Sequence, residues 1–167
     1  MIKKSLFIVC VLTISLTQLA QASDISVGDL NISNPWVRAS APGQSNGAGY
    51  VEIANKSAQP DRLLSVQSPS AKKVELHTVL TENGISKMRE VKEIAVPAQG
   101  RLKLGPGGFH IMFIQLNAPF MHGVSIPVTL NFEKAGNVNI DFVVQPATYN
   151  PNGSSNSTHN HGSMMNH

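Results

Sequence analysis

Histidine and methionine alternate with bulky apolar residues in one short segment, "FHIMF", which follows the glycine-rich turn "LGPGG". Successive side chains of a β-strand point to opposite faces, so His110 and Met112 would share one face and Phe109, Ile111 and Phe113 the other. The three bulky residues already supply a core side, which weakens the interpretation of Met112 as a core filler. Two residues of strand rise separate the Cα atoms of His110 and Met112 by about 6.6 Å. Both side chains could therefore approach one ion.

Two further donors precede this segment. His77 in "KKVELHTVL" shares the polar phase of a predicted strand with Lys73 and Glu75, and Met88 in "ISKMREV" shares a polar phase with Glu90. A histidine on a polar strand face is usually solvated, and an exposed methionine is usually incidental, so neither residue alone indicates a site. A methionine that fills a core lies in apolar phase, however, and Met88 does not.

Together these residues form a set of two imidazoles and two thioethers, without a carboxylate or a thiolate: His77, Met88, His110 and Met112. Thioether sulfur is soft and neutral, and among the metals that a cell handles in quantity it selects Cu(I). Zinc would require Cys or more His, and Ca²⁺ and Mg²⁺ would require oxygen ligands. The residue types therefore favour a Cu(I) site.

The spacing of the four donors resembles the motif H(M)x10Mx21HxM of the periplasmic copper chaperone family PCu(A)C. Other stretches are also similar to that family: "PWVRASAPGQSNGAGYVEIAN", "DRLLSVQSPSAKKVELHTV" and "IPVTLNFEKAGNVNIDFVV". The resemblance covers roughly residues 24–145. Thr78 stands where the family often has a methionine directly after the first histidine, so the optional extra sulfur is absent.

The resemblance implies a cupredoxin-like β-sandwich that carries Cu(I) at its surface and has no catalytic residues. It also implies delivery of copper to the CuA subunit of cytochrome c oxidase, alongside a Sco-type protein. Copper sequestration or resistance without delivery is the main alternative. A secreted adhesion or assembly domain with incidental donors belongs to a third class.

Other copper and enzyme classes fit the sequence poorly. A blue-copper electron carrier needs a cysteine thiolate, and the only cysteine, Cys10, lies in the predicted leader. A histidine brace would need histidine at position 23, where Ser23 stands. The serine of "GQSNG" lacks the strand–turn–helix context of a nucleophile elbow. We therefore predict that the protein is not an enzyme.

The last residues, "NPNGSSNSTHNHGSMMNH", contain no aliphatic or aromatic residue that could build a core, so we expect a disordered tail over residues 150–167. Imidazole suits Cu(II) and thioether suits Cu(I), and His-rich tracts bind metal. The tail therefore predicts a second metal site, with Cu(II) as a candidate ion. Its donors are His159, His161, Met164, Met165 and His167.

Short alternating or apolar runs recur in the predicted domain of residues 23–149, from "GYVEIAN" through "ISKMREVKEIAV" to "VNIDFVV", and turn signals such as "ENG", "GPGG" and "KAGN" separate them. This pattern predicts one all-β domain, an antiparallel β-sandwich of the cupredoxin-like or immunoglobulin-like type. Met121 and His122 in "PFMHG" are expected in a turn between strands. No segment of this region holds a helical period.

The first residues combine a basic start, an apolar run and the A-x-A site Ala20-Gln21-Ala22, which is typical of a secretory signal peptide over residues 1–22. The leader contains two of the 13 basic residues, against 10 acidic ones in the chain, so the remaining protein is close to neutral. We accordingly expect a periplasmic monomer, with no nucleic-acid partner and no membrane span after cleavage.

Overall fold

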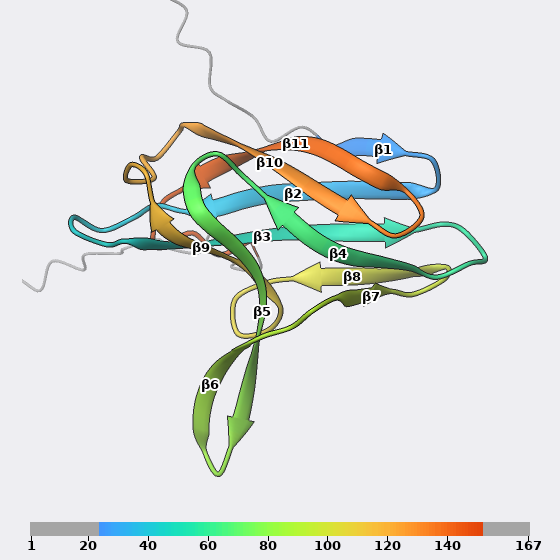
Figure 1. The fold of residues 1–167 in the computed structure, drawn as a ribbon, viewed down its shortest axis with the longest axis horizontal. Coiled ribbons are helices and arrows are strands. Elements are labelled where there is room, and N and C mark those ends of the chain that lie inside the picture. The colour runs from blue at the N-terminus through green and yellow to red at the C-terminus, as the bar shows by residue number, and fades with distance from the viewer. Residues whose placement is uncertain (1–23, 152–167) are drawn as a thin grey trace, which may run out of the picture.

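The protein is built from β-strands throughout the part described by the computed structural model, residues 24–151 (Figure 1). No helix occurs among these residues, and hence none long and apolar enough to cross a membrane. The predicted all-β class is confirmed. The strands are β1 (Ile25–Val27), β2 (Leu30–Arg38), β3 (Asn46–Asn55), β4 (Asp61–Gln67), β5 (Ala71–Glu82), β6 (Ile85–Glu90), β7 (Ile94–Val96), β8 (Gly100–Leu104), β9 (His110–Leu116), β10 (Ser125–Phe132) and β11 (Gly136–Gln145).

The predicted leader, residues 1–22, and almost all of the predicted tail, residues 150–167, lie outside the described residues. The domain boundaries drawn from the sequence therefore stay predictions.

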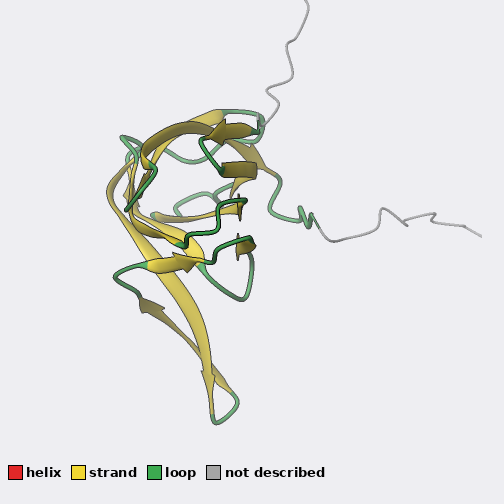
Figure 2. Cartoon of the chain, turned by 90° about the vertical axis from the view of Figure 1, so that its right-hand side faces the viewer, coloured by secondary structure: helices red, strands yellow, loops and turns green. Residues whose placement is uncertain are grey.

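The strands form one hydrogen-bonded path in the order β6-β5-β9-β3-β2-β11-β10-β4-β7, with β1 on β2 and β8 on β3. The pairings are antiparallel, as predicted, except that β2 and β11 run parallel over Trp36–Arg38 and Val143–Gln145. A parallel pair needs a long crossover, and here most of the domain lies between the two strands. Figure 2 shows the strands curving round the interior.

The concave face of this path encloses a hydrophobic core. Ile111 and Phe113 of β9 are fully buried in it, and Phe109 packs against it, as their alternation predicted. Other strands add fully buried residues: Ile32, Val37, Val51, Ile53, Leu63, Val96, Leu104, Leu130, Phe132 and Phe142. The residues between these on each strand therefore point outward, and that outer face carries the candidate site.

Strand β2 contains an irregularity that makes it difficult to predict from the sequence. Asn34 has a positive φ of 50°, Pro35 follows it, and the pairing of β2 with β3 shifts register between Ser33 and Trp36. Proline lacks a backbone donor and is confined to edges and bulges within sheets. This bulge interrupts the alternation, so neither β2 nor the short β1 was predicted as a strand.

The hairpin of β5 and β6 extends away from the rest of the molecule (Figures 1 and 2). Its turn residues, Asn83 and Gly84, have positive φ angles of 53° and 77°, which is typical of the two-residue turn that Asn-Gly favours. All six residues of β6 are exposed. Residues 85–96, which form one run in the sequence pattern, are thus divided between the exposed β6 and the separate β7.

Candidate metal centre

Strand register brings the four predicted donors to one outer face of the sheet. In the β5–β9 pairing, His77 lies directly opposite His110, and Glu75 lies opposite Met112. In the β5–β6 pairing, Met88 lies opposite Val79, which is two residues from His77 and therefore on the same face. Directly opposite residues of an antiparallel pair have Cβ atoms about 4.5–5.5 Å apart. The donors are thus near neighbours across three adjacent strands.

A cleft of about 250 Å³ lies over this face. We call it the His/Met cleft, and its described lining residues include Met88, His110 and Met112, together with Arg38 and Tyr50. The lining does not include His77, but the imidazole rings of His77 and His110 have centroids only 5.7 Å apart.

The four donors differ in exposure. His110 is buried, and His77 and Met112 are partly buried, so His77 is less solvated than its polar phase suggested. Met88 is 64% exposed. Solvent therefore reaches the cleft from the side of β6.

His77 is held by a neighbouring carboxylate on its own strand. Its Nε2 lies 2.6 Å from Oε2 of Glu75, and its Nδ1 is buried without a hydrogen-bond partner in the described chain. Leaving a buried polar atom unsatisfied costs about 1–3 kcal/mol. A metal ion would satisfy that nitrogen.

His110 is oriented by the backbone. Its Nδ1 lies 3.0 Å from the carbonyl oxygen of Gly108. A carbonyl only accepts, so Nδ1 donates, and the neutral ring then has its lone pair on Nε2. A carbonyl or carboxylate on the second ring nitrogen is the usual arrangement for metal-binding histidines.

The carboxylate of Glu75 also forms an ion pair with Lys73. The Lys73 ammonium and then the His77 ring hold the pKa of Glu75 below its ordinary value, against the opposing effect of burial. Among the described residues that line the cleft, Arg38 is the only charged one. Its guanidinium lies over the rings of Trp36 and Tyr50, at 5.7 and 6.0 Å from their centroids, and it donates to the carbonyl oxygen of Ala147.

Glu75 and Arg38 were not singled out from the sequence. Glu75 could have been, because a residue two positions before His77 shares its strand face. The position of Arg38 depends on the pairing of β2 with β3, and no pattern in the sequence indicates that pairing.

Met121 and His122 lie in the loop between β9 and β10, as predicted, and are not among the described residues that line the cleft. The predicted second site, from His159 to His167, lies outside the described residues.

Within residues 24–151, no three His, Cys, Asp or Glu residues cluster so that they could hold a metal ion. A metal in the His/Met cleft would therefore depend on the methionine sulfurs. This requirement favours a soft ion over zinc or calcium.

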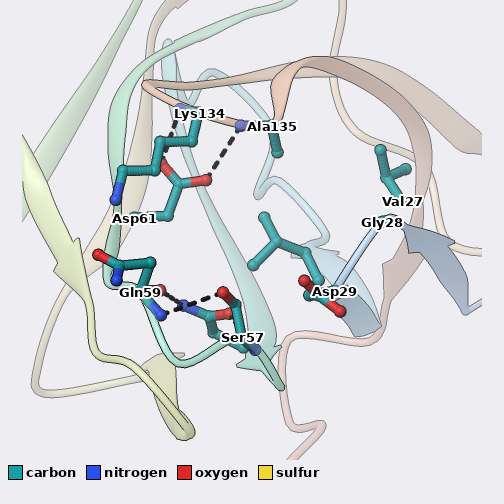
Figure 3. A pocket seen from close by; sticks show the side chains of 10 residues that line it. Val27, Gly28, Asp29, Ser57, Gln59, Asp61, Lys134 and Ala135 are labelled. Carbon is teal, nitrogen blue, oxygen red and sulfur yellow. Dashed lines mark hydrogen bonds between the residues drawn. The ribbon is translucent and has the colours of Figure 1, made fainter.

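A second hollow lies at the other end of β3, between the β3–β4 and β10–β11 turns (Figure 3). It contains the buried Asp61, whose carboxylate accepts hydrogen bonds from the backbone N–H groups of Arg62, Lys134 and Ala135 at 2.7, 2.9 and 3.1 Å. These bonds join two distant turns. We therefore interpret Asp61 as a structural clamp.

Known proteins resemble this chain in sequence. The model of the LpqE-like family, described as "Putative lipoprotein LpqE-like", matches residues 30–144. The "Putative lipoprotein Lxx21020" of Leifsonia xyli subsp. xyli is 33% identical over 114 residues, which make up 68% of this chain and 68% of that protein.

Solved structures resemble it in fold, and one of them is a PCuAC domain. The copper-bound PCuAC domain from PmoF2 superposes with a TM-score of 0.64 at 30% identity, over 74% of this chain and 98% of that domain. The solution structure of CuI-DR1885 from Deinococcus radiodurans superposes with a TM-score of 0.57 at 29% identity, over 77% of this chain and 85% of that one. These similarities agree with the predicted β-sandwich.

Proposed function

This chain belongs to the LpqE-like family, and from that membership and the geometry of the His/Met cleft we propose that it is a copper chaperone of the cell envelope. It binds one Cu(I) ion through His77, Met88, His110 and Met112. The observation that carries the proposal is the register of β5 with β6 and β9, which makes two imidazoles and two thioethers neighbours on one face. The names of two similar structures, the copper-bound PCuAC domain from PmoF2 and CuI-DR1885, record copper and Cu(I) and support the choice of metal.

The donor set suits a carrier that must release its ion. All four ligands are neutral, and thioethers need no deprotonation, so only the imidazoles make the affinity depend on pH. The exposure of Met88 beside the buried His110 supports one-sided exchange. An acceptor would approach along β6 and replace the outermost sulfur first.

We propose the CuA subunit of cytochrome c oxidase as the recipient, with a Sco-type protein as a second partner. The similarity to PCuAC domains supports a copper-handling partner of this kind. The leader of residues 1–22 would export the protein to the periplasm, where it acts without catalysis. Deletion of the gene should abolish oxidase activity, and added copper should restore it. Copper sensitivity with normal oxidase would instead favour sequestration, the alternative function.

The tail supplies a second proposal, because its donors lie in a segment without core-forming residues. We expect His159, His161 and His167 to favour Cu(II), and Met164 and Met165 to extend the site to Cu(I). Removing residues 151–167 should lower the copper stoichiometry measured with both oxidation states. An unchanged stoichiometry would exclude a metal-binding role for the tail.

The main site is tested by equilibrium dialysis under reducing conditions. The double variant Met88→Ala/Met112→Ala should lose Cu(I) binding, and X-ray absorption on the Cu(I)-loaded protein without its tail should find nitrogen and sulfur in comparable numbers. The control is Met121→Ala, because Met121 is as exposed as Met88, at 65%, but is not among the described residues that line the cleft. Cu(I) retention by the double variant at the wild-type level would refute the four-ligand assignment.

A further inference from the structure

The unsatisfied nitrogen of His77 needs an explanation. Among the described residues, Nδ1 of His77 is the one buried side-chain nitrogen or oxygen without a hydrogen-bond partner. Most buried polar side-chain atoms in proteins have a partner, so an exception often marks a functional group or an unseen ion. The opposite nitrogen of the same ring is bound tightly, at 2.6 Å from Glu75.

Glu75 is placed to fix that arrangement. Its side chain is only 9% exposed, and its two oxygens have separate partners, Lys73 and His77. A carboxylate only accepts hydrogen bonds, so Nε2 of His77 carries the hydrogen, and the neutral ring has its lone pair on Nδ1. A partly buried carboxylate with a partner on each oxygen has little freedom to release the ring.

His110 has the opposite arrangement. Its Nδ1 donates to the carbonyl of Gly108 at 3.0 Å, which leaves the lone pair on Nε2. The two facing imidazoles, with centroids 5.7 Å apart, thus offer lone pairs on different ring nitrogens.

We propose that Cu(I) is bound by Nδ1 of His77 and Nε2 of His110, and that Glu75 is the positioning residue that selects Nδ1. This inference rests on the proposed function and adds the ligating atoms and the residue behind them. Nδ1 lies near the backbone end of the ring and Nε2 at its far end. The ion therefore sits closer to the backbone of β5 than to that of β9, on the side where β6 brings Met88.

Glu75 should also strengthen the ligand. A carboxylate that accepts the second ring hydrogen raises the basicity of the metal-bound nitrogen, and loss of such a partner typically weakens metal binding about 10–100-fold. Glu75→Leu should therefore weaken Cu(I) binding by that factor. Glu75→Gln keeps an oxygen acceptor for Nε2–H and should restore most of the affinity.

The matched control is Glu90→Leu. Glu90 lies directly opposite His77 on β6, so the variant removes the same charge beside the same ring, but no hydrogen bond joins Glu90 to His77 in the described structure. Its Cu(I) affinity should stay within about twofold of wild type. Thermal unfolding of each copper-free variant separates a loss of affinity from a loss of folding.

The decisive measurement is NMR of the histidine ring nitrogens in the full-length, ¹⁵N-labelled protein, copper-free and loaded with diamagnetic Cu(I). We expect the copper-free protein to have its hydrogen on Nε2 of His77, and copper to shift Nδ1 of His77 and Nε2 of His110. A copper-free tautomer with the hydrogen on Nδ1 of His77, or copper on Nε2 of His77, would overturn the inference and leave the proposed function intact. Failure of the wild-type protein to bind Cu(I) would overturn both.

Discussion

Replacing Asp61 with alanine should destabilise the domain without changing its metal site. Asp61 is 5% exposed and accepts three backbone hydrogen bonds. One of them, from Arg62, is local. The other two, from Lys134 and Ala135, join the start of β4 to the β10–β11 turn more than 70 residues later in the chain. Asp61→Ala removes both of these long-range bonds.

The size of the effect follows from those two bonds. A hydrogen bond to a charged group contributes about 1.5–3 kcal/mol to stability. The adjoining hollow of about 290 Å³ admits water, which can replace part of the loss, so we expect the low end of the sum, about 3 kcal/mol. For a domain of this size, the midpoint of thermal unfolding should fall by about 12 °C.

The assay is unfolding by urea and by heat, each followed by circular dichroism, with Cu(I) affinity measured on the same samples. Asp61→Asn is the matched variant, because its amide oxygen can keep the bond from Lys134 while its amide nitrogen cannot accept the bond from Ala135. Asp61→Asn should lose about half as much free energy of unfolding as Asp61→Ala. The strand β3 has ten residues and spans about 30 Å between the hollow and the His/Met cleft, so Cu(I) affinity should not change. A loss below about 1 kcal/mol for Asp61→Ala, less than a single charged hydrogen bond contributes, would refute the clamp.

Two further predictions concern the cleft and the core beneath it. Met88→Leu should weaken Cu(I) binding at least tenfold, about 1.4 kcal/mol, in a competition assay with a coloured Cu(I) chelator. The free energy of unfolding should change by less than about 0.5 kcal/mol, because the side chain is 64% exposed, and equal weakening by Met121→Leu would contradict the assignment. Gly49→Ala should cost about 1–3 kcal/mol of unfolding free energy, because its Cβ would lie 2.9 Å from the ring of the buried Phe113. Gly105→Ala, whose Cβ meets no atom closer than 3.6 Å, is the control, and equal losses in the two variants would argue against overpacking.

The sequence predicted those features of the fold that depend on local alternation and turn chemistry. The buried face of β9 with Ile111 and Phe113, and the Asn83-Gly84 turn, follow from short stretches that can be interpreted without knowledge of the rest of the chain. β2 was missed because Asn34 and Pro35 interrupt its alternation. A bulge is stabilised by the partner strand, so its own segment does not reveal it.

The donor set of the candidate site could also be predicted, because spacing and residue type are properties of the sequence. The pairing of His77 with His110 was not, since it depends on the register of two strands that are distant in the chain. The hydrogen bond from His77 to Glu75 depends on rotamers within that packed face. Long-range register and side-chain orientation are therefore what the structure adds.

The exposure of strand β6 has a consequence for how long a copper ion stays bound. It pairs with β5 alone among the described strands, and no residue of it is buried, so it can open at a free energy well below that of global unfolding. Each opening would withdraw one sulfur and leave the other three donors in place. The residence time of the copper ion would then be set by a strand that contributes nothing to the hydrophobic interior. Replacing the β5–β6 hairpin with hairpins of stronger or weaker pairing would lengthen or shorten that residence time while the rest of the domain stays the same.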